Sequence, residues 1–172
     1  ERRFLPFREK LRGIISEAFL NATEFNMGCK LGSGAFGDVR RAEWKRRGFA
    51  VISVAVKTMR ADRLLNHHLE SLVTEVRNLS RLSHPKIVNF YGVIWPENEY
   101  PRLVMELVEN GTLRALIHDK TTHALTWTDP LLRVALDVTE GLVYLHSKAY
   151  IHRDVKPDNV LMTPTFAAKL TD

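Results

Sequence analysis

A dense cluster of polar residues between two apolar flanks is the feature that most constrains this sequence. The cluster lies between Ile151 and Leu161, and its members are His152, Arg153, Asp154, Lys156 and Asn159. An ordinary surface loop has no need for five specific polar side chains, whereas a loop that carries chemistry does. We therefore expect a fold that holds these side chains together at one chemical site.

The first half of the chain has the apolar pattern of strands, interrupted by one helix. Five strands are predicted, over residues 25–31, 38–44, 51–59, 87–94 and 102–107. After the third strand, apolar residues from Leu69 to Leu82 follow helical spacing, and His84-Pro85 closes the helix because proline disfavours helical backbone. The pattern predicts an α+β fold that begins with a five-stranded sheet and one helix.

The second half is predicted to be helical. Glu109-Asn110-Gly111 is a short polar break that resembles a hinge, and residues 113–117 indicate a helical turn or two. Thr128-Asp129 then supplies an N-cap and Pro130 a first helical position. The apolar face predicted for the long, buried helix that follows consists of Leu131, Ala135, Val138, Leu142 and Leu145.

Length, composition and charge exclude several classes of protein. With 172 residues, 45% of them hydrophobic, the chain can form one packed domain and is not a disordered protein. No apolar run reaches the roughly 18 residues of a membrane helix. The lone Cys29 suits a reducing compartment, so a cytoplasmic location is expected.

The net charge of +5 is concentrated in the first half of the chain. Much of the excess comes from one predicted hairpin, at Arg40, Arg41, Lys45, Arg46 and Arg47. Cations of this kind can bind nucleic acid, but no aromatic-interleaved RNA-binding signature accompanies them. A solvated hairpin is favoured, and no nucleic-acid partner is expected.

A glycine-rich segment joins the first two predicted strands. It reads Leu31, Gly32, Ser33, Gly34, Ala35, Phe36 and Gly37. Its glycines let the backbone turn sharply and bring N–H groups close to a phosphate chain, although a plain hairpin turn has the same composition. A dinucleotide-binding fold is disfavoured because a strand follows the glycines, and the Gly-Lys-Ser/Thr of a Walker motif is missing.

Lys57 ends an apolar strand, where a buried ammonium needs an anionic partner. Glu75 lies on the next helix between Val73 and Val76, near its apolar face, where an unpaired carboxylate is also costly. The two residues could therefore form an ion pair, although a strand-end lysine can also reach water. The predicted pair would hold the ammonium ready for a phosphate oxygen.

With these motifs the chain resembles a eukaryotic protein kinase. The glycine-rich segment, strand lysine, helix glutamate and the loop pattern H-R-D-x-K-x-x-N occur in the family's order. The resemblance implies a bilobal fold and a reaction that uses ATP and Mg²⁺. By the same resemblance Asp154 would orient the substrate hydroxyl and accept its proton, and Lys156 would contact the transferred phosphoryl group. Asn159 and Asp172 would bind magnesium.

Further residues match the adenine pocket of the family. By resemblance Val39 and Ala55 would lie above the ring and Leu161 below it, although each is equally compatible with an ordinary core position. Met105 would be the gatekeeper at the back of the pocket. The main chain at Glu106 and Val108 would hydrogen-bond to the adenine edge, an assignment that rests on the resemblance alone.

The resemblance also implies a substrate class. A lysine two residues after Asp154 is similar to the serine/threonine-specific form of the loop, so serine and threonine hydroxyls of proteins are the expected acceptors. The stretch from Leu125 to Asn159 most resembles the tyrosine-kinase-like group of serine/threonine kinases. The alternative is a pseudokinase or interaction scaffold without efficient phosphotransfer.

The resemblance divides the chain into a flank and a partial kinase domain. The flank is residues 1–24, and the domain is residues 25–172, with an N-lobe at 25–105, a hinge at 106–111 and a C-lobe part at 112–172. A native amino terminus and the family's elements after Asp172 are expected to be missing. The isolated fragment is therefore expected to be poorly stable and inactive.

The flank mixes basic and apolar residues. It could form a basic helix at a membrane surface or a juxtamembrane stretch of a receptor. Its net charge of +1 makes attraction to a membrane weak, so packing on the N-lobe is favoured. Oligomeric state is left open.

Overall fold

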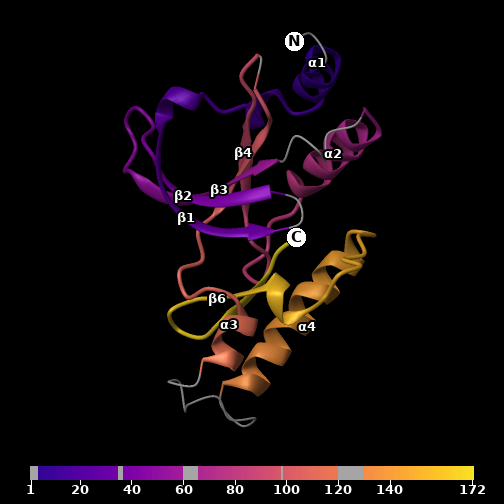
Figure 1. Ribbon diagram of the computed structural model, residues 1–172. Coiled ribbons are helices and arrows are strands. Elements are labelled where there is room, and N and C mark those ends of the chain that lie inside the picture. Colours follow the sequence, from indigo (N-terminus) through magenta and orange to yellow (C-terminus); the bar gives the residue numbers. More distant parts are fainter. Residues whose placement is uncertain (1–3, 35–36, 60–65, 98, 120–129) are drawn as a thin grey trace. The chain divides into compact units, whose positions relative to one another are not determined.

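The computed structural model describes the chain except residues 1–3, 35–36, 60–65, 98 and 120–129 (Figure 1). The chain forms two compact units. The first contains residues 1–81 and 90–107, and the second contains residues 82–89 and 108–172. Residues 82–89 thus pack with the part of the chain that follows the predicted hinge, although they precede it in the sequence.

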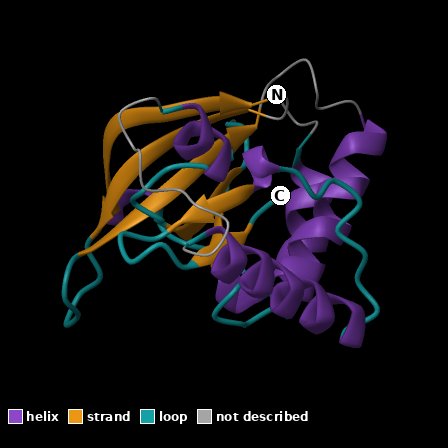
Figure 2. Cartoon of the chain, turned by 90° about the horizontal axis from the view of Figure 1, so that it is seen from below, coloured by secondary structure: helices purple, strands orange, loops and turns teal. Residues whose placement is uncertain are grey.

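The first unit contains a five-stranded antiparallel sheet, seen as the curved orange layer in Figure 2. Its strands are β1 (Phe25–Gly34), β2 (Gly37–Trp44), β3 (Ile52–Met59), β4 (Phe90–Ile94) and β5 (Arg102–Glu106). They lie in the order β1-β2-β3-β5-β4. The predicted five-stranded sheet is therefore confirmed.

Each of the five strands differs from the prediction at one end, by one to three residues. β2 begins at Gly37, where the backbone lies so close to β3 that an added Cβ would stand 1.9 Å from the Thr58 carbonyl oxygen. The predicted start of β4 at Ile87 is wrong, because β4 begins at Phe90. Ile87 instead forms a bridge with Leu170 in the second unit.

Helix α2 (Asn66–Leu79) packs one apolar face into the core of the first unit. Leu69, Leu72, Val73 and Val76 are buried at the three- and four-residue spacing of a helix. The prediction that the helix extends to Leu82 is wrong. Leu82 packs against the core of the second unit.

The flank packs on the first unit. Helix α1 (Leu5–Ile14) buries Leu11 completely in the core that α2 also lines, and 3-10 turns follow at Ser16–Ala18 and Ala22–Glu24. The Leu20 N–H donates to the Val93 carbonyl at 2.9 Å. This approach requires Gly92, where a Cβ would meet the Ala18 carbonyl oxygen at 2.3 Å. The flank is therefore an integral part of the first unit.

The second unit consists of two helices and a small hairpin. Its elements are α3 (Leu113–His118), α4 (Leu131–Ser147), a 3-10 turn (Pro157–Asn159), β6 (Val160–Met162) and β7 (Ala168–Leu170). The Thr112 hydroxyl caps α3 by accepting from the Ala115 N–H at 3.1 Å. The core of this unit lies between α4 and the β6–β7 hairpin, with Val134, Leu145, Met162 and Leu170 buried.

The predicted face of α4 is confirmed in part, because Leu145 is buried and Val138 and Leu142 pack against the core. Val134, Asp137 and Gly141 also face the core, while Ala135 is exposed. Pro130 occupies the N-cap and not the first helical position, and the predicted cap at 128–129 lies outside the described residues. The apolar sequence of α4 is wide enough to accommodate both the predicted and the observed face, so the spacing alone could not choose between them.

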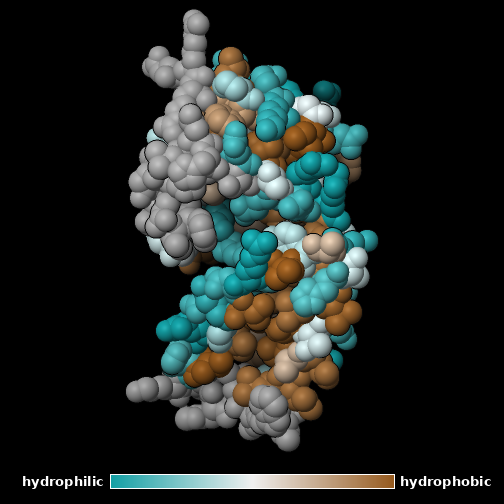
Figure 3. Space-filling model, turned by 90° about the vertical axis from the view of Figure 1, so that its right-hand side faces the viewer, coloured by the Kyte–Doolittle hydropathy of each residue, from teal (hydrophilic) through white to brown (hydrophobic). Residues whose placement is uncertain are grey.

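The prediction of a long, buried helix holds for one side of α4 only. Leu132, Leu136 and Val143 are 46%, 57% and 64% exposed on its outer side. Figure 3 views the chain from the side on which α4 lies, and hydrophobic side chains gather there on the second unit. None of the helices in the described part of the chain has the length and hydropathy of a membrane span.

Candidate active site

The polar cluster of the second unit is built around the Asp154 carboxylate. Lys156 Nζ donates to Asp154 Oδ2 at 2.7 Å, and Asn159 Nδ2 donates to the same oxygen at 3.0 Å. Asn159 Nδ2 also donates to the Asp154 carbonyl at 2.9 Å. Asn159 is buried, whereas the side chains of Asp154 and Lys156 are about half exposed. The carboxylate is thus fixed from two sides and still reaches solvent.

These contacts stabilise the charged forms of both residues. The hydrogen bond from Lys156 is the main cause that lowers the pKa of Asp154, with the Asn159 amide and the His152 ring adding to it. The hydrogen bond to Asp154 likewise raises the pKa of Lys156, and the negative charges of Asp158 and Asp172 act in the same direction. Asp154 is an ionised acceptor, and Lys156 is a cation, at neutral pH.

The β6–β7 hairpin brings the end of the chain to this cluster. Asn159 precedes β6 and Thr171 follows β7, and the Thr171 N–H donates to the Asn159 carbonyl at 3.0 Å. Asp172 is the next residue, so its backbone follows directly from this contact. Asp172 also lies near enough to Lys156 for its charge to act on the Lys156 pKa.

His152 ties the loop to the same hairpin. Its Nδ1 accepts from the Asp154 N–H at 3.4 Å, and its Nε2 lies 3.1 Å from the Thr171 carbonyl oxygen. Because Nδ1 accepts, Nε2 carries the hydrogen and donates to Thr171. The histidine of the motif therefore positions the backbone of Asp154, a role that the sequence reading did not assign.

Asp137 is a second residue that the sequence reading missed. Its carboxylate is 7% exposed, forms an ion pair with Lys86, and accepts from the Ala168 N–H at 2.8 Å. It thereby anchors β7, the strand that leads to Asp172. The available signal was an acidic residue on the apolar side of α4, where an unpaired charge is costly.

The donor set near Asp154 fits a hard divalent cation. Both N–H groups of the Asn159 amide point to Asp154, which leaves its carbonyl oxygen as the one atom able to bind a metal. The Asp172 carboxylate is the second candidate ligand. Within the described ranges, no three His, Cys, Asp or Glu side chains converge on a metal position. Two oxygens from the protein, with water and phosphate completing the shell, suit Mg²⁺.

In the first unit, four of the predicted site residues share one face of the sheet. Val39 is paired with Lys57 across β2 and β3, and Ala55 is paired with Met105 across β3 and β5. Residues directly opposite one another, or two apart on one strand, point to the same side. The register therefore gathers two apolar side chains, a methionine and an ammonium on one face.

The structure supports half of the argument for pairing Lys57 with Glu75. Lys57 is 7% exposed, as predicted for an ammonium that needs an anionic partner. Glu75 lies between the buried Val73 and Val76 as predicted but is itself exposed, so burial does not make an unpaired carboxylate costly there. The pairing of the two residues stays a prediction.

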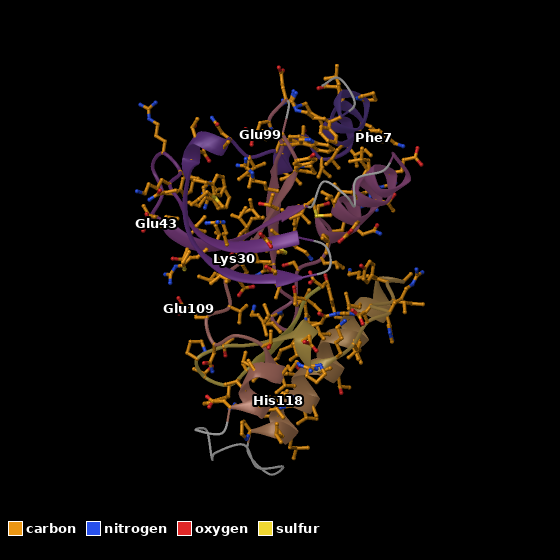
Figure 4. All side chains as sticks on the ribbon, in the orientation of Figure 1. Phe7, Lys30, Glu43, Glu99, Glu109 and His118 are labelled. Carbon is orange, nitrogen blue, oxygen red and sulfur yellow. The ribbon has the colours of Figure 1, made fainter. Side chains whose placement is uncertain are left out.

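The remaining candidates are placed as follows. Leu31, Gly32, Ser33 and Gly34 end β1, and the register continues through Gly34 opposite Gly37, while residues 35–36 lie outside the described residues. Lys30, labelled in Figure 4, forms an ion pair with Asp38 at 3.2 Å across the two strands.

The predicted adenine contacts fall in both units. Glu106 ends β5 in the first unit, whereas Val108 and Leu161 belong to the second. Leu161 lies in β6 and forms an antiparallel bridge with Thr112, and the Asn110 N–H donates to the Met162 carbonyl at 3.0 Å. The end of the predicted hinge is therefore tied to β6.

Comparisons with known proteins agree with this geometry. Tyrosine-protein kinase csk-1 of Caenorhabditis elegans is 34% identical over 89% of this chain and 27% of the relative. Human receptor-interacting serine/threonine-protein kinase 1 is 32% identical over 89% of this chain and 22% of the relative. Serine/threonine/tyrosine-protein kinase HT1 of Arabidopsis thaliana is 32% identical over 95% of this chain and 41% of the relative.

The chain thus spans less than half the length of these curated relatives, which include kinases of both specificities. The family described as protein tyrosine and serine/threonine kinase matches residues 25–172, from the start of β1 to Asp172. That range contains both the sheet face with Lys57 and the loop with Asp154. The chain belongs to the protein tyrosine and serine/threonine kinase family.

Proposed function

We propose that this chain is the nucleotide-binding and catalytic part of an ATP-dependent protein kinase that phosphorylates serine and threonine. The observation that supports the proposal most directly is the Asp154 carboxylate, held by Lys156 and Asn159 beside Asp172. Phosphoryl transfer depends mainly on positioning and on neutralising oxygen charges. This cluster offers an acceptor for a proton, a cation, and two oxygen ligands for a metal.

In the proposed reaction the substrate hydroxyl oxygen forms a bond to the γ-phosphorus of ATP. The bond between that phosphorus and the oxygen bridging to the β-phosphate breaks, and ADP leaves with the electron pair. Asp154 orients the hydroxyl and accepts its proton. Lys156 contacts the transferred phosphoryl group, where its positive charge offsets the negative charge on the equatorial oxygens.

Asn159 and Asp172 would hold Mg²⁺, which supplies positive charge to the phosphate oxygens when bound. Asn159 is suited to this because its amide orientation is fixed by Asp154. Thr171 is the residue before Asp172, and the contact of His152 with Thr171 holds the loop at a fixed distance from it.

We assign nucleotide contacts to the first unit as well. The backbone N–H groups of the glycine-rich segment and the Lys57 ammonium would bind the phosphates, with Glu75 pairing with Lys57. The apolar side chains on the Lys57 face of the sheet suit an adenine ring. The proposed adenine contacts are Val39, Ala55, Met105, Leu161 and the main chain of Glu106 and Val108.

Serine/threonine specificity and membership of the tyrosine-kinase-like group are the finer parts of the proposal. Serine/threonine specificity rests on Lys156, because tyrosine-specific loops usually carry alanine or arginine nearby. Membership of the tyrosine-kinase-like group rests on the resemblance of residues 125–159 to that group. A peptide array that presents serine, threonine and tyrosine in one sequence context tests this. Phosphate on tyrosine alone would contradict it.

The decisive variant for phosphotransfer is Asp154→Asn in the natural full-length protein. Asparagine keeps the size and the Asn159 contact but cannot accept a proton, so kcat is expected to fall by about 10²- to 10⁴-fold. Binding of ATP, measured by calorimetry, should change little. Incorporation of radiolabelled phosphate at the wild-type rate would refute the assignment, and no incorporation by the wild type would favour a scaffold function.

A further inference from the structure

The first unit contains a hollow that the proposed reaction does not use. It has a volume of about 370 Å³ and lies between α1, the flank and the end of β4. In Figure 4, Phe7 on α1 and Glu99 in the turn after β4 mark this end of the unit. The residues that carry the argument are Arg8, Arg12, Phe19, Leu20, Ile94 and Trp95.

Two residues that line this hollow each carry a buried N–H group that lacks an acceptor in the described part of the chain. One group is the indole N–H of Trp95, a residue that is 3% exposed, and the other is the Nε–H of Arg8, whose side chain is 12% exposed. Indole and guanidinium groups can donate hydrogen bonds but cannot accept them. A buried donor without an acceptor is costly, so the hollow favours a ligand with acceptor oxygens.

The charges around the hollow favour an anion. Arg8 Nη1 lies 3.5 Å from Glu97 Oε1, but the Glu97 side chain is 78% exposed. Arg12 Nη1 lies 3.8 Å from Glu9 Oε1, with half of each side chain exposed. Long, exposed ion pairs contribute little, so both guanidinium groups are available to a ligand.

Most of the remaining lining is apolar, apart from Asn21, whose side-chain oxygen accepts from the Thr23 N–H. Phe19, Leu20 and Ile94 provide the apolar surface, and the Arg12 guanidinium lies over the Phe19 ring at 5.3 Å from the ring centroid. A ligand with a charged end and an apolar body would bury its body here while its oxygens reach the two free donors.

We propose that this hollow binds a carboxylate attached to an apolar group. The carboxylate oxygens accept from Arg8 Nε–H and Trp95 Nε1–H, and the planar carboxylate matches the edge of the guanidinium. The apolar group lies against Phe19 and Ile94. The same chemistry is present in a small aromatic acid and in the carboxyl end of a peptide with an apolar last residue.

Titration of the ¹⁵N-labelled chain with phenylacetate tests the proposal. The indole N–H signal of Trp95, identified by its loss in Trp95→Phe, should shift and saturate. Phenylacetamide has the same shape without charge and should bind at least about tenfold more weakly. N-acetylphenylalanine mimics the carboxyl end of a peptide, and its amide lacks the charge. Saturable binding of N-acetylphenylalanine without binding of its amide supports a peptide carboxyl end as the ligand.

Arg8→Lys keeps the charge but removes the Nε donor, and should weaken binding of phenylacetate by about tenfold. Arg47→Lys changes an exposed cation of the β2–β3 hairpin and should leave binding unchanged. The proposal is wrong if phenylacetate leaves the Trp95 signal in place, or if phenylacetamide or the Arg8→Lys variant binds equally well. Tighter binding of phenyl phosphate would overturn the choice of a carboxylate.

Discussion

The loop with Asp154 and the sheet face with Lys57 achieve their geometry in different ways. In the loop, the partners of Asp154 lie two and five residues away in the sequence, at Lys156 and Asn159. On the sheet, Val39, Lys57 and Met105 meet because three strands pair in one register. A short polar motif specifies its own hydrogen bonds, whereas a sheet face exists only after distant segments have paired.

The charged side chains of the two regions also differ in their exposure to solvent. Asp154 and Lys156 have side chains that are 53% and 47% exposed, so water stabilises them as well as their partner does. Lys57 is 7% exposed, so most of its surface has been removed from water. Substitutions that remove long-range support should therefore cost more than substitutions inside the loop.

The largest effect is expected from Asp137, which supports the loop from a distance. Asp137→Ala removes the ion pair with Lys86 and the acceptor for the Ala168 N–H. The free energy of unfolding should fall by about 3 kcal/mol, the lower end of the range for breaking a buried pair, because Lys86 can reach solvent. Denaturant titration measures the loss, and hydrogen exchange should show it first at β6 and β7.

Asp137→Asn is the matched control for this change. It keeps an acceptor for Ala168 and loses only the charge, so its cost should be smaller than that of alanine. Equal protection of β7 in the alanine variant and the wild type would show that the hairpin holds its position without α4.

A smaller loss is expected at Gly37, which brings β2 and β3 together beside Lys57. In Gly37→Ala the new Cβ would stand 1.9 Å from the Thr58 carbonyl oxygen, so one strand must move. We expect a cost of about 2 kcal/mol and weaker nucleotide binding. Gly13→Ala on α1 meets no atom within 4 Å and should stabilise the chain by about 0.5 kcal/mol. Opposite signs in two thermal melts would verify the contrast.

The smallest effect is expected inside the loop. Lys156→Met removes the hydrogen bond that is the main cause of the lowered pKa of Asp154, so this pKa should rise toward 3.8. NMR titration of the Asp154 carboxyl group measures the change, with Lys148→Met on the α4 side as the control. An unchanged pKa would mean that Asn159 and the backbone hold Asp154 without Lys156.

The sign of the pH dependence follows from the same contacts. A carboxyl group whose pKa is lower in the folded state adds stability above its unfolded pKa, and that stability is lost as pH falls through the folded pKa. Lys156 has a raised pKa, so its contribution is present below 10.5 and disappears as pH rises through the folded value. Lys156→Met should therefore flatten the pH dependence of stability at both ends.

Much of this structure could be predicted from sequence because the signals in the sequence are local. The two-residue period predicted the five strands, and the three- and four-residue spacing from Leu69 to Val76 predicted α2. The polar motif predicted that Asp154, Lys156 and Asn159 lie together, and the structure joins them by hydrogen bonds. The end of α2 was misjudged, because Leu82 continues the helical spacing after the helix has stopped.

What the sequence by itself determined is the set of elements and the internal geometry of the loop with Asp154, because periodicity and short hydrogen bonds act between near neighbours. Only the tertiary structure decided the rest. It exposed Glu75, turned Asp137 toward β7, and packed residues 82–89 with a unit that otherwise begins at Val108. These outcomes depend on which apolar faces pack against one another. Several faces have similar hydrophobicity, and the sequence pattern does not identify the element that each face packs against.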